Sequence, residues 1–335
     1  MKIYGNSAAV EQVANMVRNG REPHSIIIHG EKGLGKKTLA KYIAAQLMCS
    51  EGSGIPCGKC RACRLLEKGG HPDLITARPN SNGNYIYSAD DPDSVRQYIS
   101  DAVVKPNEGN IKVYLIPDLD RSQVTTQIAV QNIFLKLIEE PPEHTAIIFT
   151  ARSKEIFLPT IISRTLDLGV VNVRESESAE YLRENYPDRS QADIADAVSA
   201  GRGNIGRCEA YLNREEFYAA AQTARKIAAA AASGSEYEIL RAFADADGKK
   251  ALLREAVCLF SEIVRDSCVI RLCGRADAVL TGCDSEAAAR LAERISAGAG
   301  TRLYDLLCEY VGRIDANCNL TLTVNSLAGQ IAQII

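Results

Sequence analysis

Short apolar runs alternate with segments of helical periodicity through the first half of the chain. Two of the runs, SIIIH at residues 25–29 and KVYLI at residues 112–116, are so continuously apolar that both faces of the strand should be buried. The pattern predicts strands at residues 25–29, 74–76, 112–116, 146–150 and 166–168. Buried strands that alternate with helices are typical of a parallel sheet covered by helices.

Helical periodicity fills the segments between these strands. We expect helices at residues 6–18, 36–48, 92–104 and 123–139. The last of them should end before Pro141 and Pro142, because proline cannot continue a helix.

The strand-like runs cease after about residue 172. Two or three short helices are expected within residues 175–212, broken by the glycine-rich GRGNIG at residues 201–206. Longer helices are expected at residues 215–232, 236–244, 249–272, 285–297, 302–316 and 320–335, with breaks near Gly234, Gly248, Gly274, Gly282 and Gly300. The chain therefore divides into an α/β domain (residues 1–172), a small helical domain (173–212) and an all-helical domain (213–335).

The composition is that of an ordinary soluble globular protein. Of 335 residues, 46% are hydrophobic and 24% are charged, and 39 basic against 42 acidic side chains give a net charge of -3. This charge provides no strong field for a polyanion, so any contact with nucleic acid should be local or shared with partners. The N-terminus resembles no secretory signal and no apolar run could span a membrane, so we expect a cytoplasmic protein.

The segment GEKGLGKK at residues 30–37 follows an apolar strand and opens a helix, which is the setting of a phosphate-binding loop. Gly30, Gly33 and Gly35 permit a tight turn whose backbone amides face an anion, while Lys36 adds a full positive charge. The sequence therefore predicts a cradle for a phosphate group.

The magnesium-binding half of such a loop is deficient. Lys37 stands where a hydroxyl should bind Mg²⁺, and Thr38 is one residue too late to point the same way. The strand at residues 112–116 ends in Pro117 and Asp118 instead of a well-placed metal acid. We favour binding of a nucleotide or phosphate without turnover; the alternatives are a loop that binds nothing and a working hydrolase.

Four of the eleven cysteines, Cys49, Cys57, Cys60 and Cys63, lie within fifteen residues. Four thiolates can surround Zn²⁺ tetrahedrally and leave no position for a catalytic water, so the spacing predicts a structural zinc site. The surrounding residues are too small and polar for the alternative, a packed core of cysteines.

Basic residues surround this cysteine segment. Lys59, Arg61, Arg64 and Lys68 could contact DNA, although a solvated basic face is an equally good interpretation. His71 could be considered a metal ligand, but four cysteines already satisfy the ion and we interpret it as structural.

An arginine also stands out in Ser163-Arg164-Thr165, after the fourth predicted strand. It could be an ordinary surface residue, or it could reach the γ-phosphate of a neighbouring subunit as an arginine finger. Spacing alone favours the ordinary surface residue.

Taken together, the motifs resemble those of the bacterial clamp-loader AAA+ proteins of DNA polymerase III. The resemblance covers nearly the whole chain and rests on GEKGLGKKTLA (30–40), the CxxCxxC segment followed by GGHPDL (69–74), KVYLI (112–116), LIEEPPEH (137–144), LPTIISRT (158–165) and GNIG (203–206). It implies a P-loop AAA+ domain with an inserted zinc module, a helical lid and an all-α collar for oligomerisation.

Departures from the family's motor subunits, gamma and tau, imply a non-motor subunit. The resemblance places Lys37, Pro117-Asp118 and Gly206 where the motor has a threonine, an Asp-Glu pair and an arginine. Arg207 is adjacent to the arginine position but should face elsewhere on its helix.

By the same resemblance, Arg164 would complete the ATP site of an adjoining motor subunit, which reverses the preference from spacing. The implied partners are gamma or tau motor subunits and a delta subunit in a hetero-pentamer, which would load the sliding clamp onto primed DNA. The isolated chain would then be no enzyme, although it would belong to a holoenzyme with DNA-directed DNA polymerase (nucleotidyltransferase) activity.

Two other functions stay open at this stage. In an active motor, Asp118 and Asp120 would hold Mg²⁺ and Lys37 would be a tolerated substitution. In a zinc-dependent DNA-binding module, the basic residues near the cysteines would carry the affinity.

Overall fold

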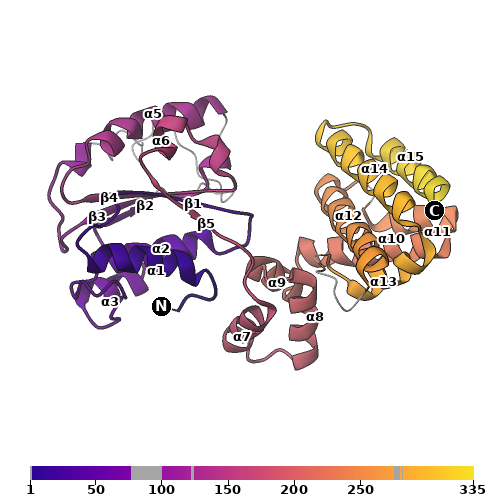
Figure 1. Ribbon diagram of the computed structural model, residues 1–335, viewed down its shortest axis with the longest axis horizontal. Coiled ribbons are helices and arrows are strands. Elements are labelled where there is room, and N and C mark those ends of the chain that lie inside the picture. The colour runs from indigo at the N-terminus through magenta and orange to yellow at the C-terminus, as the bar shows by residue number, and fades with distance from the viewer. Residues whose placement is uncertain (1, 77–99, 122–123, 247, 275–279, 281) are drawn as a thin grey trace. The chain divides into compact units, whose positions relative to one another are not determined.

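The computed structural model describes residues 2–76, 100–121, 124–246, 248–274, 280 and 282–335. It divides the chain into two compact units, Met1–Val173 and Arg174–Ile335 (Figure 1). The division into three domains, with boundaries after residues 172 and 212, stays a prediction.

The first unit is built on a five-stranded parallel sheet with strand order β2-β3-β4-β1-β5. The strands are β1 (Ser25–His29), β2 (Leu74–Thr76), β3 (Lys112–Ile116), β4 (Thr145–Ala151) and β5 (Leu166–Gly169). All five predicted strands are confirmed, within one residue at each end. β1, β3 and β4 are the continuously apolar runs, and nearly all of their residues are buried because helices cover both faces of the sheet.

Helices cover the sheet on both sides (Figure 1). The described residues of this unit include the helices α1 (Ser7–Arg18), α2 (Lys36–Met48), α3 (Arg61–Glu67), α5 (Val124–Glu139) and α6 (Pro159–Ile162). Successive residues of β1 point to opposite faces. Ile26 and Ile28 accordingly join the core formed with α1, α2 and α3, whereas Ile27 joins the core formed with α5 and α6.

The sequence correctly located α1, α2 and α5. The helix expected at residues 92–104 lies mostly outside the described residues, and only residues 100–102 are seen as helical. The short helices α3 and α6 were not predicted, because segments of seven and four residues are too short to show a clear helical period.

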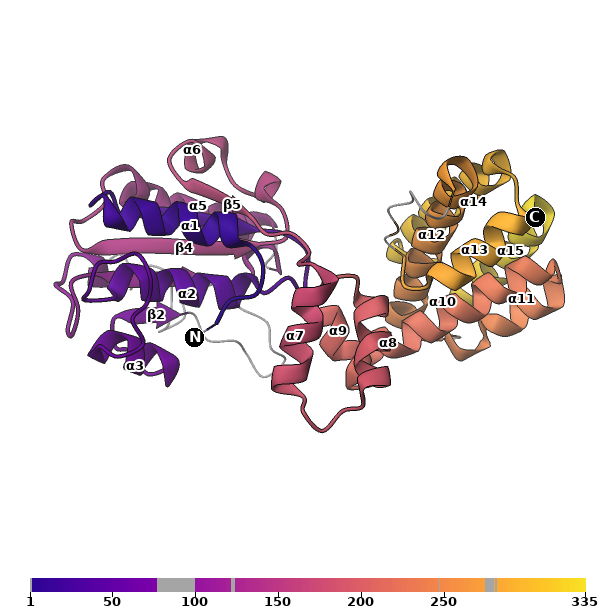
Figure 2. The ribbon, with the colours of Figure 1, turned by 60° about the horizontal axis from the view of Figure 1, so that its bottom comes forward.

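The second unit contains only helices among its described residues. They are α7 (Glu175–Asn185), α8 (Gln191–Gly201), α9 (Ile205–Leu212), α10 (Glu216–Ser233), α11 (Glu236–Ala242), α12 (Lys250–Cys273), α13 (Ser285–Arg294), α14 (Ala297–Asp315) and α15 (Leu320–Ile334). One continuous hydrophobic core runs from Leu182 in α7 to Ile331 in α15. Figure 2 shows α12, α13 and α14 packed side by side in this core.

The break predicted near Gly300 is wrong, because Gly300 lies inside α14. The helix begins at Ala297, where the Ser296 hydroxyl caps it by accepting a hydrogen bond from the amide of Ala299. A β-carbon at Gly300 would come within 2.3 Å of the sulfur of Cys268 on α12. The glycine therefore serves close helix packing and does not interrupt the helix.

Across the described ranges, no helix combines the length and the apolar character that a bilayer span requires.

Candidate functional site

The glycine-rich loop connects β1 to α2, at the carboxyl edge of the sheet. Gly30 donates hydrogen bonds to the carbonyls of Ala151 (3.2 Å) and Arg152 (3.1 Å) at the end of β4. A β-carbon at Gly30 would come within 2.5 Å of the carbonyl oxygen of Val170, so only glycine fits between these segments. Gly35 has a φ of 80° and provides the N-cap of α2 without a side-chain cap.

The ammonium of Lys36 turns back onto its own loop. Its Nζ donates to the carbonyl oxygens of Gly30 at 2.6 Å and Glu31 at 2.7 Å, and the side chain is buried. Burial lowers the pKa of Lys36, while the carboxylates of Asp118 and Asp120 oppose this change. The predicted phosphate-binding charge is thus present but is bound by backbone carbonyls.

Lys37 forms an ion pair with Asp118. Its Nζ lies 2.8 Å from Oδ2 of Asp118, whose carboxylate is largely buried at the tip of β3. The backbone amide of Asp118 donates to the hydroxyl of Thr150 at 2.9 Å, which holds this tip against β4. Thr38, the next residue on α2, is exposed.

The second acid near the loop, Asp120, is also paired with a cation. Arg152 donates its backbone amide to Oδ1 at 3.2 Å and places its guanidinium Nε 3.4 Å from Oδ2. P-loop folds usually bind nucleotide with Mg²⁺. Here a divalent ion would have to displace an ammonium from Asp118 and a guanidinium from Asp120, with no hydroxyl at position 37 to help. The residues present do not fit a magnesium site.

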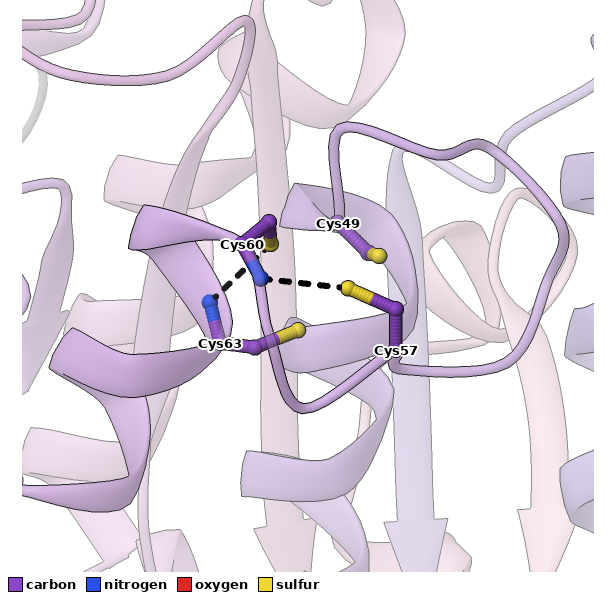
Figure 3. A group of neighbouring side chains, drawn as sticks. All are labelled: Cys49, Cys57, Cys60 and Cys63. Atoms are coloured by element: carbon purple, nitrogen blue, oxygen red, sulfur yellow. Dashed lines mark hydrogen bonds between the residues drawn. The ribbon is translucent and has the colours of Figure 1, made fainter.

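The four clustered cysteines come together where α2 meets α3 (Figure 3). Cys49 follows the last turn of α2, Cys57 lies in the connecting loop, Cys60 caps α3 and Cys63 lies in its first turn. Their sulfur atoms all lie within 4.8 Å of one another. A metal with M–S bonds of about 2.3 Å requires sulfurs roughly 3.8 Å apart, so a small contraction would complete a tetrahedral site. The structure thus brings together four thiols that could bind a metal ion.

Backbone amides point at two of these sulfurs. The amide of Cys60 lies 3.3 Å from Sγ of Cys57, and the amide of Cys63 lies 3.4 Å from Sγ of Cys60. Burial disfavours the Cys60 thiolate, but amide and hydroxyl donors from Cys63 and Ser50 outweigh it and lower the pKa of Cys60 to about 6. Burial raises the pKa of Cys63 to about 12. A metal would have to displace the Cys63 proton on binding.

The loop that carries Cys57 is anchored to α1. A β-carbon at Gly54 would lie 2.4 Å from the carbonyl oxygen of Ala14, so the two backbones are in direct contact. The buried amide of Gln46 donates to the carbonyls of Val10 (3.1 Å) and Gly54 (2.7 Å), which joins α1, α2 and the loop. The cysteine cluster is thereby held in a fixed place on the α/β unit.

Asp73 is a buried carboxylate whose role the sequence analysis missed. It accepts hydrogen bonds from the backbone and side-chain amides of Asn107 (2.7 and 3.1 Å) and from the amides of Glu108 (2.8 Å) and Gly109 (3.1 Å). Glu108 in turn forms a bidentate pair with Arg61 on α3, at 2.6 and 2.8 Å. Asp73 therefore connects the start of β2 to the cysteine segment through one loop.

The structure shows the surroundings of the other predicted residues near the cysteines. His71 is buried, and its Nδ1 accepts a hydrogen bond from the amide of Asp73 at 3.1 Å. Burial lowers the pKa of His71, so the neutral ring is favoured. These contacts support a structural role. The four basic side chains of this segment, namely Lys59, Arg61, Arg64 and Lys68, are exposed.

Arg164 lies just after α6, on a different segment from the loop and the cysteines. Its Nη1 donates to the carbonyl of Thr160 at 3.1 Å and to the hydroxyl of Ser163 at 3.2 Å. Its Nη2 lies 3.7 Å from the Glu139 carboxylate, and the side chain is 44% exposed. Hydrogen bonds through Nη1 hold one edge of the guanidinium, and the side chain remains accessible to solvent.

Arg207, adjacent to the family's arginine position, is engaged within the helical unit. Its guanidinium pairs with Glu262 at 3.7 Å and lies over the ring of Phe217 at 5.7 Å. It therefore faces the core of that unit.

Comparison with known proteins places these features in a family. A family model described as "DNA polymerase III, delta subunit" matches residues 5–173, half of the chain. Subunit tau/gamma of Haemophilus influenzae DNA polymerase III is 27% identical over 209 residues, which are 61% of this chain and 29% of that protein. Subunit delta' of Pseudomonas aeruginosa is 29% identical over 182 residues (54% and 53%), and subunit delta' of Escherichia coli is 27% identical over 233 residues (69% and 67%).

The chain spans less than two thirds of the length of the first two relatives. Both tau/gamma and delta' proteins match at similar identity. Sequence identity alone therefore does not distinguish a tau/gamma protein from a delta' protein. A distinction has to rest on the side chains around the glycine-rich loop.

The Asp73 contacts lead to a pH-dependent prediction. Burial would raise the pKa of Asp73, but the donors from Asn107, Glu108 and Gly109 outweigh it and lower the pKa. Its stabilising effect should therefore be complete above its unfolded pKa of about 3.9 and disappear as the pH falls through the lower folded value. Asp73→Asn places an amide against two backbone donors and should cost about 2–4 kcal/mol at pH 7.

Amide hydrogen exchange of residues 107–109, in the whole chain, measures this cost. The difference between Asp73→Asn and the unsubstituted protein should shrink below about pH 4. Exposed Asp305 on α14 provides the control, since Asp305→Asn should leave exchange in this loop unchanged. Equal exchange of the Asp73→Asn and unsubstituted proteins at pH 7 would contradict the role of this carboxylate.

Proposed function

This chain belongs to the family described as DNA polymerase III, delta subunit, and we propose that it is the non-motor, delta'-type subunit of a bacterial clamp loader. In this role it supports ATP-dependent loading of the sliding clamp onto primed DNA while neighbouring subunits hydrolyse the ATP. The observation that carries the proposal is the ion pair between Lys37 and Asp118.

A motor needs anionic and hydroxyl ligands for Mg²⁺ beside the phosphate loop. In this chain Lys37 replaces the hydroxyl and also neutralises Asp118, so a single residue removes one ligand and blocks another. Lys36 donates hydrogen bonds to the carbonyls of Gly30 and Glu31. These contacts support a loop that does not turn nucleotide over.

Arg164 is proposed as the catalytic contribution of the chain, given in trans to an adjoining motor subunit. Guanidinium groups stabilise the charge that develops on a transferred γ-phosphoryl group. The accessible guanidinium, anchored through Nη1 to Thr160 and Ser163, supports this role because little rearrangement is needed to present it.

The cysteine cluster is proposed to bind structural zinc. Four thiols from two short segments match the donor set of closed zinc sites, and no position remains for a water. The metal would join the end of α2 to α3, and the chain's own contacts at Gly54 and Asp73 would fix the module on the sheet.

The proposed partners are gamma or tau motor subunits and a delta subunit, with the helices of the second unit as the collar of a hetero-pentamer. The chain would act on the sliding clamp and primed DNA as part of this complex, in the cytoplasm. The isolated chain would not be an enzyme.

The nucleotide prediction concerns Lys37. Isothermal titration calorimetry of the isolated chain with ATP should give weak or no binding that depends little on Mg²⁺, and the chain should show no steady hydrolysis. Lys37→Thr restores a hydroxyl and releases Asp118, so Mg²⁺ should strengthen nucleotide binding to this variant. Lys41→Thr, on the exposed side of α2, is the matched control and should behave like the unsubstituted protein. Rapid hydrolysis by the unsubstituted chain alone, or a strong magnesium requirement for binding, would refute the non-motor assignment.

The zinc prediction concerns Cys60. Elemental analysis of the purified chain should find one zinc per molecule, and Cys60→Ser should lose most of it. Because structural zinc contributes about 10 kcal/mol or more in small modules, chelation should unfold residues 49–63 locally and expose them to protease. Cys273→Ser changes an exposed cysteine on α12 and should retain zinc. Full zinc content in Cys60→Ser would exclude a four-thiolate site.

The arginine prediction requires the assembled loader. Arg164→Ala should reduce ATP turnover at the site that this chain completes by roughly 10³-fold or more. The total ATP turnover of the complex should therefore fall by the fraction that this site contributes. Size-exclusion chromatography should show unchanged assembly. Arg183→Ala, an exposed arginine on α7, should change neither quantity. Unchanged turnover of the Arg164→Ala complex would remove the trans-finger proposal.

A further inference from the structure

Glu139 is the last residue of α5, and it lies beside Arg164 although the two are far apart in the sequence. Its Oε1 is 3.7 Å from Nη2 of Arg164. The chain leaves α5 through Glu140 and the Pro141-Pro142 pair, which cannot extend the helix. The position of the Glu139 backbone is thus set by the end of α5.

The Arg164 guanidinium contacts three groups, two through Nη1 and one through Nη2. Nη1 donates to the Thr160 carbonyl at 3.1 Å and the Ser163 hydroxyl at 3.2 Å, and that hydroxyl itself donates to Thr160 at 3.1 Å. These bonds hold one amino group on the end of α6. The Glu139 carboxylate attracts the other amino group, so the plane of the guanidinium is defined by two helices.

The pair contributes little to the stability of the fold. Both side chains are 44% exposed, and a separation of 3.7 Å is longer than a hydrogen bond. Exposed pairs of this kind have small effects on unfolding, and salt screens them. A function for Glu139 must therefore be sought in what it does to Arg164 itself.

We propose that Glu139 is a positioning residue for Arg164, which keeps the guanidinium turned toward the γ-phosphate of an adjoining motor subunit. The inference rests on the proposed function of Arg164. An arginine side chain has many rotamers, and an attraction at Nη2 reduces the number that it occupies before the phosphate arrives. Since the contact is longer than a hydrogen bond, a phosphate oxygen can approach Nη2 without first breaking a bond to Glu139.

The test uses the assembled loader and measures the part of its ATP turnover that Arg164→Ala removes. Glu139→Gln keeps the shape of the side chain but removes its charge, and should reduce this Arg164-dependent turnover about two- to fivefold at low salt, with KM for ATP nearly unchanged. The reduction should diminish at high salt because the pair is exposed. Glu140→Gln is the matched control: it changes the adjacent glutamate, which is also exposed, and should leave turnover unchanged.

A double variant separates positioning from local damage to the fold. If Glu139 acts through Arg164, adding Glu139→Gln to Arg164→Ala should cause no further loss, whereas a further loss would show that Glu139 acts on the structure and would overturn the inference. Equal turnover of the Glu139→Gln and unsubstituted complexes would also overturn it, even if Arg164→Ala is inactive at its site, and the proposed function would then survive. If Arg164→Ala has no effect, the proposed function fails and the inference fails with it.

Discussion

The contact between Lys37 and Asp118 is the constraint on which the chemistry of the α/β unit depends. Parallel strands bring the ends of β3, β4 and β1 to one edge of the sheet, so the acid after β3 and the loop after β1 lie on the same edge, on either side of β4. In this chain the residue that faces the acid is itself a cation, at 2.8 Å. A divalent ion could bind there only by displacing an ammonium from a largely buried carboxylate. The strand order and the loop of the proposed nucleotide site are present, while the acids beside the loop pair with cations of the chain itself.

The cysteine module depends on the sheet as much as on its own sulfurs. It is attached at one end through Gly54 and Gln46 to α1, and at the other through Arg61 and Glu108 to the loop that Asp73 holds. Small metal modules usually need the metal to fold at all. Here the larger domain fixes both flanks of the segment, and the four sulfurs between them lie within 4.8 Å of one another. A bound metal would hold the intervening residues together by joining the end of α2 to α3.

The sequence predicted the parts of this structure that depend on local pattern. The buried strands were found because SIIIH and KVYLI are apolar without interruption, and α2 was found because its apolar positions follow the helical period. Gly300 was misjudged as a break, because glycine also occurs where another helix passes close by, and the approach of Cys268 is a tertiary contact. The cysteine cluster was predictable from the local pattern, since all four cysteines lie close together in the sequence.

Contacts between distant segments could not be predicted in this way. Asp73 was part of a recognised motif, GGHPDL, yet its partners at residues 107–109 are known only once β2 and β3 pair. The ion pair of Lys37 likewise requires the tip of β3 to reach α2, although the deficiency at position 37 was visible in the sequence.

The two groups of cations in the α/β unit differ in how fully the chain neutralises them. At the glycine-rich loop, Lys36 is bound by two carbonyls at 2.6 and 2.7 Å and Lys37 by a carboxylate at 2.8 Å. At α6, Arg164 meets its carboxylate only at 3.7 Å, and this carboxylate, Glu139, is 44% exposed whereas Asp118 is 12% exposed. Attraction falls with distance and with solvent exposure, so a phosphate from outside competes with weak contacts at Arg164 and with strong ones at the loop. The strong internal contacts at the glycine-rich loop and the weak ones at Arg164 both support the proposed non-motor subunit, which presents Arg164 to a neighbouring subunit.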